Sequence, residues 1–437
     1  MKTIKKIIYA LSFLVFLACD NFEHIISENN MAFTVNIPGG PVQLNGNPIL
    51  INATTTTQGG INHRMLCKVT NTNGTIPGGP WTDSIQPFSG AVQFNIQGYV
   101  DMIFDYEFQE SHDTDDFYFE RNSLISVITV EIGEKYVDGN GDLVETWRGS
   151  PDTLTILKGK LTRHELNSLT SLNVNFYDYF INTTPVRWLT KLERTFVPGT
   201  IQQASRPILH VNHYYNVAKA WFIAPSNDNL VAKCSFVYKN GQVVTVTSDP
   251  FAVTKHKLYE IPLSYFAQEL NDNQALDRYD VWFEGSVFNV EKYTVFSERE
   301  NSMSEENPII FFANSLGVVE AVNCYGQVRQ GLQTKGETVY VDNNDFEVKK
   351  HTVSLRDASS TTPFFINTGF KTVEERRWLV DLLESEFVWL YLPHINNAFG
   401  NPYTAIPVTI VPGNYDIYDS EQDLMSLDIE FRIAHEY

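Results

Sequence analysis

The stretch Cys234-Ser-Phe-Val-Tyr-Lys-Asn-Gly-Gln-Val-Val-Thr-Val-Thr247 decides the fold class of this chain. Two runs rich in β-branched and aromatic residues, 234–239 and 242–247, flank the dipeptide Asn240-Gly241. Asn-Gly is the preferred centre of a two-residue hairpin turn, because both central positions need a positive φ. The stretch therefore predicts a β-hairpin and favours antiparallel sheet in the chain around it.

Short strands separated by turn residues continue on both sides of this hairpin. Phe33–Ile37 alternates before a Pro-Gly-Gly-Pro turn, and Asp138-Gly-Asn-Gly141 separates the predicted strands 123–132 and 142–147. Such spacing is typical of β-sandwiches, and the 13% aromatic content also favours sheet over helix. We therefore predict a mainly β fold made of tandem, immunoglobulin-like β-sandwich domains.

Two short helices interrupt the strands. Thr162-Arg-His-Glu165 and Thr372-Val-Glu-Glu375 have the spacing of a capping box, and predict helices near 163–169 and 373–385. The apolar stripe of the second helix is expected to cover a sheet, and consists of Trp378, Leu379, Leu382 and Leu383. Its opposite face is expected to carry Arg377, Asp381 and Glu384.

The chain has 437 residues, which is too long for one ordinary hydrophobic core. Pro185 and the polar segment 297–307 are the places where we expect domains to meet. The predicted order is a signal peptide at 1–18, a tether at 19–30, and β-sandwich domains at 31–183, 184–307 and 308–437. The short helices belong to the first and the third of these domains.

The first twenty residues, MKTIKKIIYALSFLVFLACD, have the order of a secretory signal. Lys2, Lys5 and Lys6 precede an uncharged apolar run, and a small residue, Ala18, ends it. About a dozen apolar residues are fewer than the roughly 20 that a spanning helix needs. We therefore expect this segment to be cleaved.

The tetrapeptide Phe16-Leu-Ala-Cys19 resembles the lipobox of bacterial lipoproteins, although Leu is usual where this chain has Phe16. The resemblance covers only the first twenty residues. It implies that Cys19 is acylated through its sulfur and becomes the mature N-terminus. The alternatives are an ordinary cleaved signal, a membrane-tethered helix, and translation from Met31, in which case the anchor would not exist.

The formal net charge of −20 limits the partners of this protein. Affinity for nucleic acid depends mainly on neutralising phosphates with Lys and Arg, so we exclude nucleic acid as a partner. Direct spreading on anionic lipid is disfavoured for the same reason. Membrane contact is expected through the N-terminal lipid.

If Cys19 is acylated, three cysteines remain: Cys67, Cys234 and Cys324. They lie far apart in the sequence, no CxxC occurs, and their odd number allows at most one disulfide. This is not the pattern of a disulfide-stapled scaffold. We expect three small, buried core residues, and a disulfide between two of them stays open.

The densest acidic stretch runs from Asp105 to Asp116. Carboxylates crowded on a loop suit Ca²⁺, which takes six to eight oxygen ligands in loose geometry, so Asp113, Asp115 and Asp116 are the candidate ligands. A solvated acidic loop without metal is the competing interpretation, and it is the one we expect. Asp138-x-Asn140-x-Asp142 begins like an EF-hand loop, but Leu143 stands where Gly is needed, so we predict a plain hairpin there.

Motifs of the common hydrolases and nucleotide-binding enzymes are missing from the sequence. HExxH, GxSxG, a phosphate-binding loop and the dinucleotide fingerprint do not occur. His210 and His213 lie in a predicted strand, where residues three apart point to opposite faces. We therefore predict that the protein is not an enzyme. A glycan-acting enzyme that uses one pair of its many carboxylates stays as the third hypothesis.

Aromatic residues near loops and strand ends are the better functional clue, since exposed flat rings bind sugars and proteins. Sheet core is the competing interpretation for each of them. The candidate binding residues are Tyr214, Tyr215, Trp389, Tyr391 and Tyr403.

The body of the chain resembles tail-region β-sandwich proteins of Bacteroidota phages and prophages. The resemblance rests on landmarks scattered over residues 31–437, namely Asn47–Ile51, Arg187–Thr190, Phe311–Gly317 with Glu320, Trp378–Ser385 and Ile406–Ile410. It implies a structural protein of a virion. The signal at the start departs from that family, whose members assemble in the cytoplasm.

The leading hypothesis is therefore a lipid-anchored, non-catalytic binding or structural protein of the cell envelope. We expect it at the outer membrane or surface of a Gram-negative bacterium, with a protein or glycan ligand, and an oligomer is compatible with this role. The alternative is a phage or prophage tail subunit that is translated from Met31.

Overall fold

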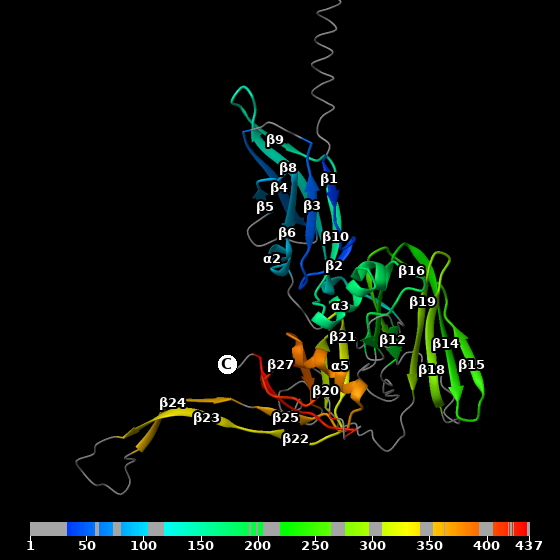
Figure 1. The fold of residues 1–437 in the computed structure, drawn as a ribbon. Coiled ribbons are helices and arrows are strands. Elements are labelled where there is room, and N and C mark those ends of the chain that lie inside the picture. The colour runs from blue at the N-terminus through cyan, green and yellow to red at the C-terminus, as the bar shows by residue number, and fades with distance from the viewer. Residues whose placement is uncertain are drawn as a thin grey trace, which may run out of the picture. The chain divides into compact units, whose positions relative to one another are not determined.

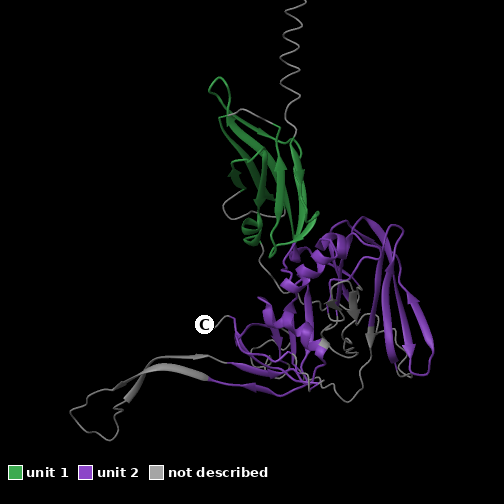
Figure 2. Ribbon diagram, viewed as in Figure 1, with its two compact units in different colours: residues 1–104, 126–156 green, residues 105–125, 157–437 purple. Residues whose placement is uncertain are grey.

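The computed structural model describes residues 33–56, 61–72, 80–103, 118–191, 194–197, 200–203, 219–263, 276–296, 308–340, 353–361, 363–392, 405–417, 419, 422 and 424–434. These residues are mainly β, as predicted, with several separate sheets and few helices (Figure 1). The chain forms two compact units, residues 1–104 with 126–156 and residues 105–125 with 157–437 (Figure 2). Among the described residues, no helix combines the length and hydrophobicity needed to cross a membrane.

The first unit is a sandwich of two sheets. One sheet has the order β1-β3-β6, and the other has the order β2-β10-β8-β4-β5 with β9 paired to β8. Alternate side chains of both sheets meet in one core, for example Ile51, Phe94, Cys67 and Val130. The elements are β1 (Thr34–Asn36), β2 (Val42–Leu44), β3 (Leu50–Thr54), β4 (Ile61–Asn71), β5 (Trp81–Ile85), β6 (Ala91–Asn95), α2 (Gln97–Asp101), β8 (Ile125–Val137), β9 (Leu143–Trp147) and β10 (Asp152–Leu157).

The turn between β8 and β9 is the hairpin predicted at Asp138–Gly141. Oδ1 of Asp138 accepts hydrogen bonds from the backbone N–H groups of Asn140 and Asp142, both at 2.9 Å. Gly141 has a φ of 89°, which a residue with a side chain rarely adopts. The first acidic residue of the EF-hand-like pattern therefore holds its own turn together.

The second unit contains another two-sheet sandwich. One sheet has the order β13-β17-β7, and the other β15-β14-β18-β19 with β16 paired to β14. Large rings fill the core between them, including Trp188, Phe222, Phe236 and Phe283. The elements are β7 (Phe119–Glu120), β13 (Lys219–Ile223), β14 (Asp228–Tyr238), β15 (Val243–Thr247), β16 (Phe251–Val253), β17 (Leu258–Pro262), β18 (Leu276–Glu284) and β19 (Asn289–Phe296).

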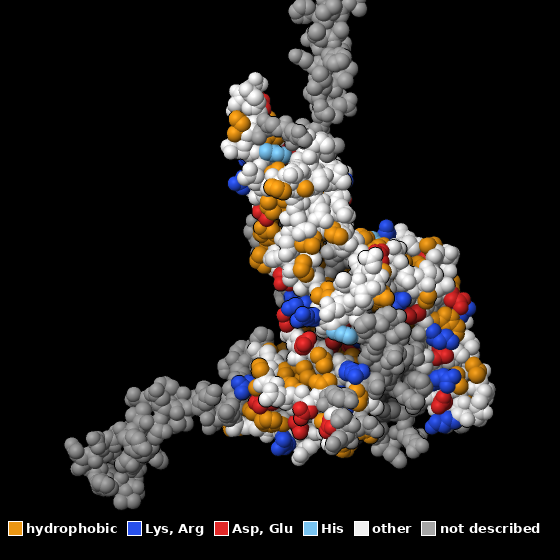
Figure 3. Space-filling view, viewed as in Figure 1, with side chains coloured by type: hydrophobic (Ala, Val, Ile, Leu, Met, Phe, Trp, Pro, Cys, Tyr) orange, Lys and Arg blue, Asp and Glu red, His pale blue; other side chains and the backbone are white. Residues whose placement is uncertain are grey.

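The predicted Asn240-Gly241 hairpin is confirmed as the β14–β15 pair. Its register joins Val237 to Val243, and Gly241 has a φ of 86°. The outer face of this sheet carries alternating basic and acidic side chains (Figure 3). Three of its ion pairs are Lys233 with Glu284, Lys292 with Asp280, and Arg278 with Asp277. Such exposed pairs contribute about 0–1 kcal/mol each, and they keep this face charge-balanced and solvated.

The third core of the chain lies in the same unit and has a helix as its second layer. A seven-stranded sheet with the order β21-β20-β26-β27-β28-β25-β22 is covered by α5, whose Trp378, Leu379 and Leu382 pack against Phe312 and Leu390. The sandwich predicted for 308–437 is thus one sheet and one helix. The strands are β20 (Ile309–Ala313), β21 (Val319–Asn323), β22 (Val328–Gln330), β25 (Phe364–Asn367), β26 (Val388–Tyr391), β27 (Ile406–Ile410) and β28 (Asp428–Ile433), and α5 is Val373–Glu384.

The remaining elements of the second unit are short or stand apart from the large sheets. β23 and β24 form a two-stranded ribbon that continues from β22 and β25 (Figure 1). The bounds are η1 (Asn122–Leu124), α3 (Arg163–Ser171), η2 (Tyr177–Ile181), β11 (Arg194–Val197), β12 (Thr200–Gln203), β23 (Gln333–Tyr340) and β24 (Val353–Thr361).

Both capping boxes are confirmed. In α3 the side chain of Thr162 accepts from the N–H of Glu165 at 3.3 Å, and Oε2 of Glu165 accepts from the N–H of Thr162 at 2.7 Å. Thr372 and Glu375 make the same reciprocal pair at 3.2 and 2.7 Å. The local spacing of hydroxyl and carboxylate was therefore sufficient to place both helix starts.

The predicted domain boundaries differ from the two compact units. Each predicted domain has its own core, but the second and third cores share one unit. The segments 105–125 and 157–183, which were assigned to the first domain, also belong to the second unit. The reason is tertiary, because Glu165, at the start of α3, contacts Ser315 and Lys191 of the second unit.

We predict that Asp228→Asn lowers the free energy of unfolding by about 1–2 kcal/mol at pH 7. The carboxylate of Asp228 accepts from the N–H groups of Val287 and Phe288 and from the N–H and hydroxyl of Ser286. Burial opposes ionisation, but these donors outweigh it and lower the pKa of Asp228 to about 2.

Because the folded-state pKa of Asp228 is depressed, its contribution is present above the ordinary pKa of 3.8 and is lost as the pH falls toward 2. Urea unfolding of both proteins between pH 7 and pH 2.5 measures the difference. Asp277→Asn, at an exposed ion pair, is the control with little expected effect. A difference that does not shrink at acid pH would contradict this account.

Candidate functional site

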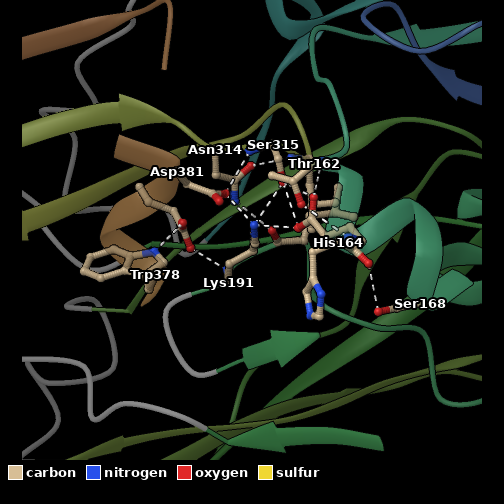
Figure 4. A network of polar contacts seen from close by, with 12 residues as sticks. Thr162, His164, Ser168, Lys191, Asn314, Ser315, Trp378 and Asp381 are labelled. Carbon is tan, nitrogen blue, oxygen red and sulfur yellow. Dashed lines mark hydrogen bonds and ion pairs between the residues drawn. The ribbon is translucent and has the colours of Figure 1, made fainter. Parts of the chain in front are cut away.

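Lys191 lies at the centre of a buried ionic cluster in the second unit (Figure 4). Its Nζ lies 2.5 Å from Oδ2 of Asp381, 2.5 Å from Oε1 of Glu165 and 3.0 Å from Oγ of Ser315. The side chains of Lys191, Asp381 and Glu165 are 8%, 4% and 3% exposed. One ammonium therefore pairs with two carboxylates, and all three groups are largely shielded from water. We call Lys191, Glu165, Ser315, Asp381 and Glu320 the Lys191 cluster.

Separate elements fix each member of the cluster. Glu165 is held at the start of α3 by its capping box, so its carboxylate cannot rotate freely. Asp381 lies on α5, one helical turn after Trp378. Ser315 sits in the turn between β20 and β21, where its N–H donates to Oδ2 of Asp381 at 3.0 Å. Its hydroxyl donates to Glu165 at 2.9 Å.

Glycine is needed where this turn meets the chain that enters α3. Gly317 has a φ of 84°, and a Cβ at Gly159 would lie 2.8 Å from the backbone of Ser315 and Gly317. Two backbones can therefore approach only because both residues lack a side chain. This close approach brings Ser315 within reach of Glu165.

Glu320 is the second acceptor of the cluster. Its Oε1 accepts from the N–H of Lys191 at 2.5 Å, and its Oε2 accepts from Nε1 of Trp378 at 2.8 Å. Burial, with a further contribution from Asp381, raises the pKa of Glu320 to about 7, although the two N–H donors favour the ionised form. Glu320 therefore changes protonation near neutral pH.

The segment Trp188–Lys191 ties the second and third cores together. The N–H of Leu189 donates to the carbonyl of Trp221 at 2.7 Å, and its own carbonyl accepts from Nδ2 of Asn314 at 3.0 Å. Nε1 of Trp221 donates to the carbonyl of Val319 at 2.8 Å. These bonds join β13 to the β20–β21 hairpin, which explains why both cores belong to one compact unit.

The charge state of Lys191 limits what the cluster can do. Burial favours the neutral amine, but Asp381 and Glu165 outweigh it and raise the pKa of Lys191 above its ordinary range. The Lys191–Ser315 contact has the spacing of a serine–lysine pair, but a protonated amine cannot take the hydroxyl proton. In its resting state the cluster is therefore a structural ion cluster.

A second buried cluster surrounds Glu260 on β17. Its Oε2 lies 2.6 Å from Nε of Arg121, and its Oε1 lies 2.8 Å from Nζ of Lys219. Burial opposes ionisation, but Lys219 and Arg121 outweigh it and lower the pKa of Glu260. Arg121 directly follows β7, which pairs with β17. The ion pair between Arg121 and Glu260 therefore helps to keep residues 118–125 in the second unit.

Most of the predicted site residues lie outside the described part of the chain. They are Cys19, Asp113, Asp115, Asp116, Tyr214, Tyr215 and Tyr403. Trp389 and Tyr391 lie on β26 and are 7% and 9% exposed, so the competing interpretation, sheet core, holds for these two rings. β26 is an interior strand, paired with β20 on one edge and β27 on the other, and its side chains are buried on both faces.

None of the five members of the Lys191 cluster is predicted as a site residue by the sequence. Asp381 was expected to face away from the core, but it is 6% exposed, because it lies beside the apolar stripe and its carboxylate reaches Lys191. Lys191 has no distinguishing local pattern. The sequence identifies Glu165 only as a capping residue, and that role does not predict its contacts with Ser315 and Lys191. Arg377 and Glu384 are exposed as predicted.

The three cysteines Cys67, Cys234 and Cys324 are free and buried, as expected. Each lies in a different core. Burial raises the pKa of Cys67 and of Cys324 to about 12, and that of Cys234 further. Such thiols are unreactive, because the thiolate is the nucleophile.

Within the described residues, no group of three or more His, Cys, Asp or Glu side chains is arranged to hold a metal ion. The candidate Ca²⁺ ligands lie outside those residues. No protein-family model matches the chain, and no curated protein matches it.

Proposed function

We propose that this chain is a lipid-anchored, non-catalytic protein of the cell envelope that binds a protein or glycan through its β domains. The observation that carries the proposal is the N-terminal sequence, in which three lysines, an uncharged apolar run and Ala18 lead directly to Cys19. Acylation of Cys19 would hold an acidic chain at a membrane that its own charge does not favour.

The buried clusters support a structural or binding role. Within each cluster the charges are paired: Lys191 with Glu165 and Asp381 in one, and Lys219 with Glu260 in the other. The two carboxylates keep Lys191 protonated. They connect elements from distant parts of the sequence, as a rigid scaffold requires. A binding role is tested directly by a glycan array probed with the purified Cys19→Ser protein.

We predict that Cys19→Ser moves the protein from the membrane fraction to the soluble fraction or leaves it with an uncleaved signal. Intact mass of the wild-type membrane fraction should show acyl chains on a chain that begins at Cys19. Cys324→Ser, which replaces a buried thiol in a distant core, is the control that keeps the wild-type fractionation. A soluble wild-type chain that begins at Met31 would overturn the proposal.

The second candidate is a virion structural subunit translated from Met31. The observation that favours it is the β23–β24 ribbon, whose strands pair only with each other in the described part of the chain. An isolated two-stranded ribbon is marginally stable in water, and assembly with another subunit would stabilise it. Tail or baseplate genes on both sides of the coding sequence would support this candidate over the lipoprotein.

A further inference from the structure

The Lys191 cluster places one amine nitrogen between two carboxylates. We propose that the side chains of Lys191 and Asp381 become joined by an intramolecular amide bond, with Glu165 carrying the protons. The observation behind this is one nitrogen that contacts two carboxylates of different elements, with all three side chains at least nine-tenths buried. The proposal does not depend on the lipid anchor or on any ligand.

The positions of the reacting atoms are favourable. Nζ of Lys191 lies 2.5 Å from Oδ2 of Asp381, and the carboxyl carbon is one bond from that oxygen, so it lies at most about 3.8 Å from Nζ, close to the range of about 3–3.5 Å from which bonds form. The two groups come from the 188–191 segment and from α5, and both are fixed by the fold. Because the fold holds the amine beside the carboxyl group, the two groups react within one molecule, which is faster than a reaction between two separate molecules.

The turn at Ser315 supplies a hydrogen-bond donor that would stabilise the negative charge formed during the reaction. Its N–H donates to Oδ2 of Asp381 at 3.0 Å, on the oxygen that would gain negative charge when the nitrogen adds to the carbon. Its hydroxyl contacts both Nζ of Lys191, at 3.0 Å, and Oε1 and Oε2 of Glu165, at 2.9 Å. A backbone donor and a hydroxyl bridge therefore already surround the reacting atoms.

Glu165 is the proton carrier, because its Oε1 lies 2.5 Å from Nζ. It takes one proton from the ammonium of Lys191 and passes it to the carboxylate of Asp381. The free amine then adds to the carboxyl carbon, and Glu165 moves a second proton from the nitrogen to the leaving oxygen. A C–N bond forms, a C–O bond breaks and one water leaves. Glu165 ends ionised, and the net charge is unchanged.

We assign Asp381, and not Glu165, as the carboxyl group that forms the amide, because the carboxylate of Glu165 already takes part in the capping box. Oε2 of Glu165 accepts from the N–H of Thr162 at 2.7 Å in the capping box, and amide formation there would disturb the start of α3. The reaction also removes one buried ammonium and one buried carboxylate, whose desolvation opposes folding. The product would link two distant segments in a chain whose described cysteines are free.

The test uses the full chain as Cys19→Ser, so that no lipid adds mass. We expect its intact mass to lie about 18 Da, one water, below the mass of its sequence. After trypsin, the chain should resist cleavage at Lys191. It should yield one branched peptide in which Trp188–Arg194 is joined to Trp378–Arg432. Fragmentation should place the link between Lys191 and Asp381.

Three comparisons make the result decisive. Lys191→Arg should restore the full sequence mass, and Glu165→Gln should slow bond formation by at least ~100-fold. Lys233 lies at the same 2.5 Å from Glu284, but in the exposed sheet, so it should stay unmodified and be cleaved normally. Full mass and complete cleavage at Lys191 in the folded Cys19→Ser chain would overturn the proposal, as would a link to Glu165. This readout depends on no substitution within the Lys191 cluster.

Discussion

Replacing Lys191 with methionine is expected to lower the free energy of unfolding by about 3–5 kcal/mol. Methionine has a similar length and no nitrogen, so Glu165 and Asp381 would both be left as buried carboxylates without Nζ of Lys191, which lies 2.5 Å from each of them. A buried charge whose partner is removed keeps its full desolvation penalty. Equilibrium urea unfolding of the wild type and of Lys191→Met measures the change.

Two controls separate this effect from the loss of a lysine in general. Lys233→Met removes an ion pair of the same length on an exposed sheet, and is expected to cost less than about 1 kcal/mol. The triple variant Lys191→Met, Glu165→Gln, Asp381→Asn removes all three charges and should recover more than half of the lost stability. If Lys191→Met and Lys233→Met lowered the free energy of unfolding equally, the claim that the buried Lys191 cluster stabilises the fold would be contradicted.

Raising the pH from 4.5 to 7.5 is expected to remove about 3 kcal/mol of stability through Glu320 alone. Burial raises the pKa of this carboxyl to about 7 in the folded chain, from 4.5. Below pH 4.5 the group is protonated in both states, so its contribution is fully present. Between these pH values the unfolded chain ionises first, and the folded state loses its advantage.

Glu320→Gln isolates this contribution, because glutamine carries no charge at any pH. The variant loses one acceptor, since Oε1 and Oε2 of Glu320 both accept from N–H donors, and its unfolding curve is therefore offset at every pH. What matters is the slope of the wild-type minus variant difference between pH 4.5 and 7.5. Parallel pH profiles would show that Glu320 ionises in the folded chain as it does in water.

Elements set by neighbouring residues were predictable from the sequence. The Asn240-Gly241 and Asp138–Gly141 hairpins and the two Thr-x-x-Glu capping boxes are present as predicted. In each of them the groups that bond are at most a few residues apart, so their spacing in the chain is also their spacing in space.

The sequence by itself determined the β class, the turns, the helix starts, the burial of three cysteines and the acidic charge, because these depend on local spacing and composition. Only the tertiary structure decided that Asp381 is buried, that Trp389 and Tyr391 lie inside a sheet, and that α3 joins the second unit. The physical reason is the same in each case. Lys191 meets partners from α3, the β20–β21 turn and α5 only after three distant segments pack together, and no periodicity along the chain records that encounter.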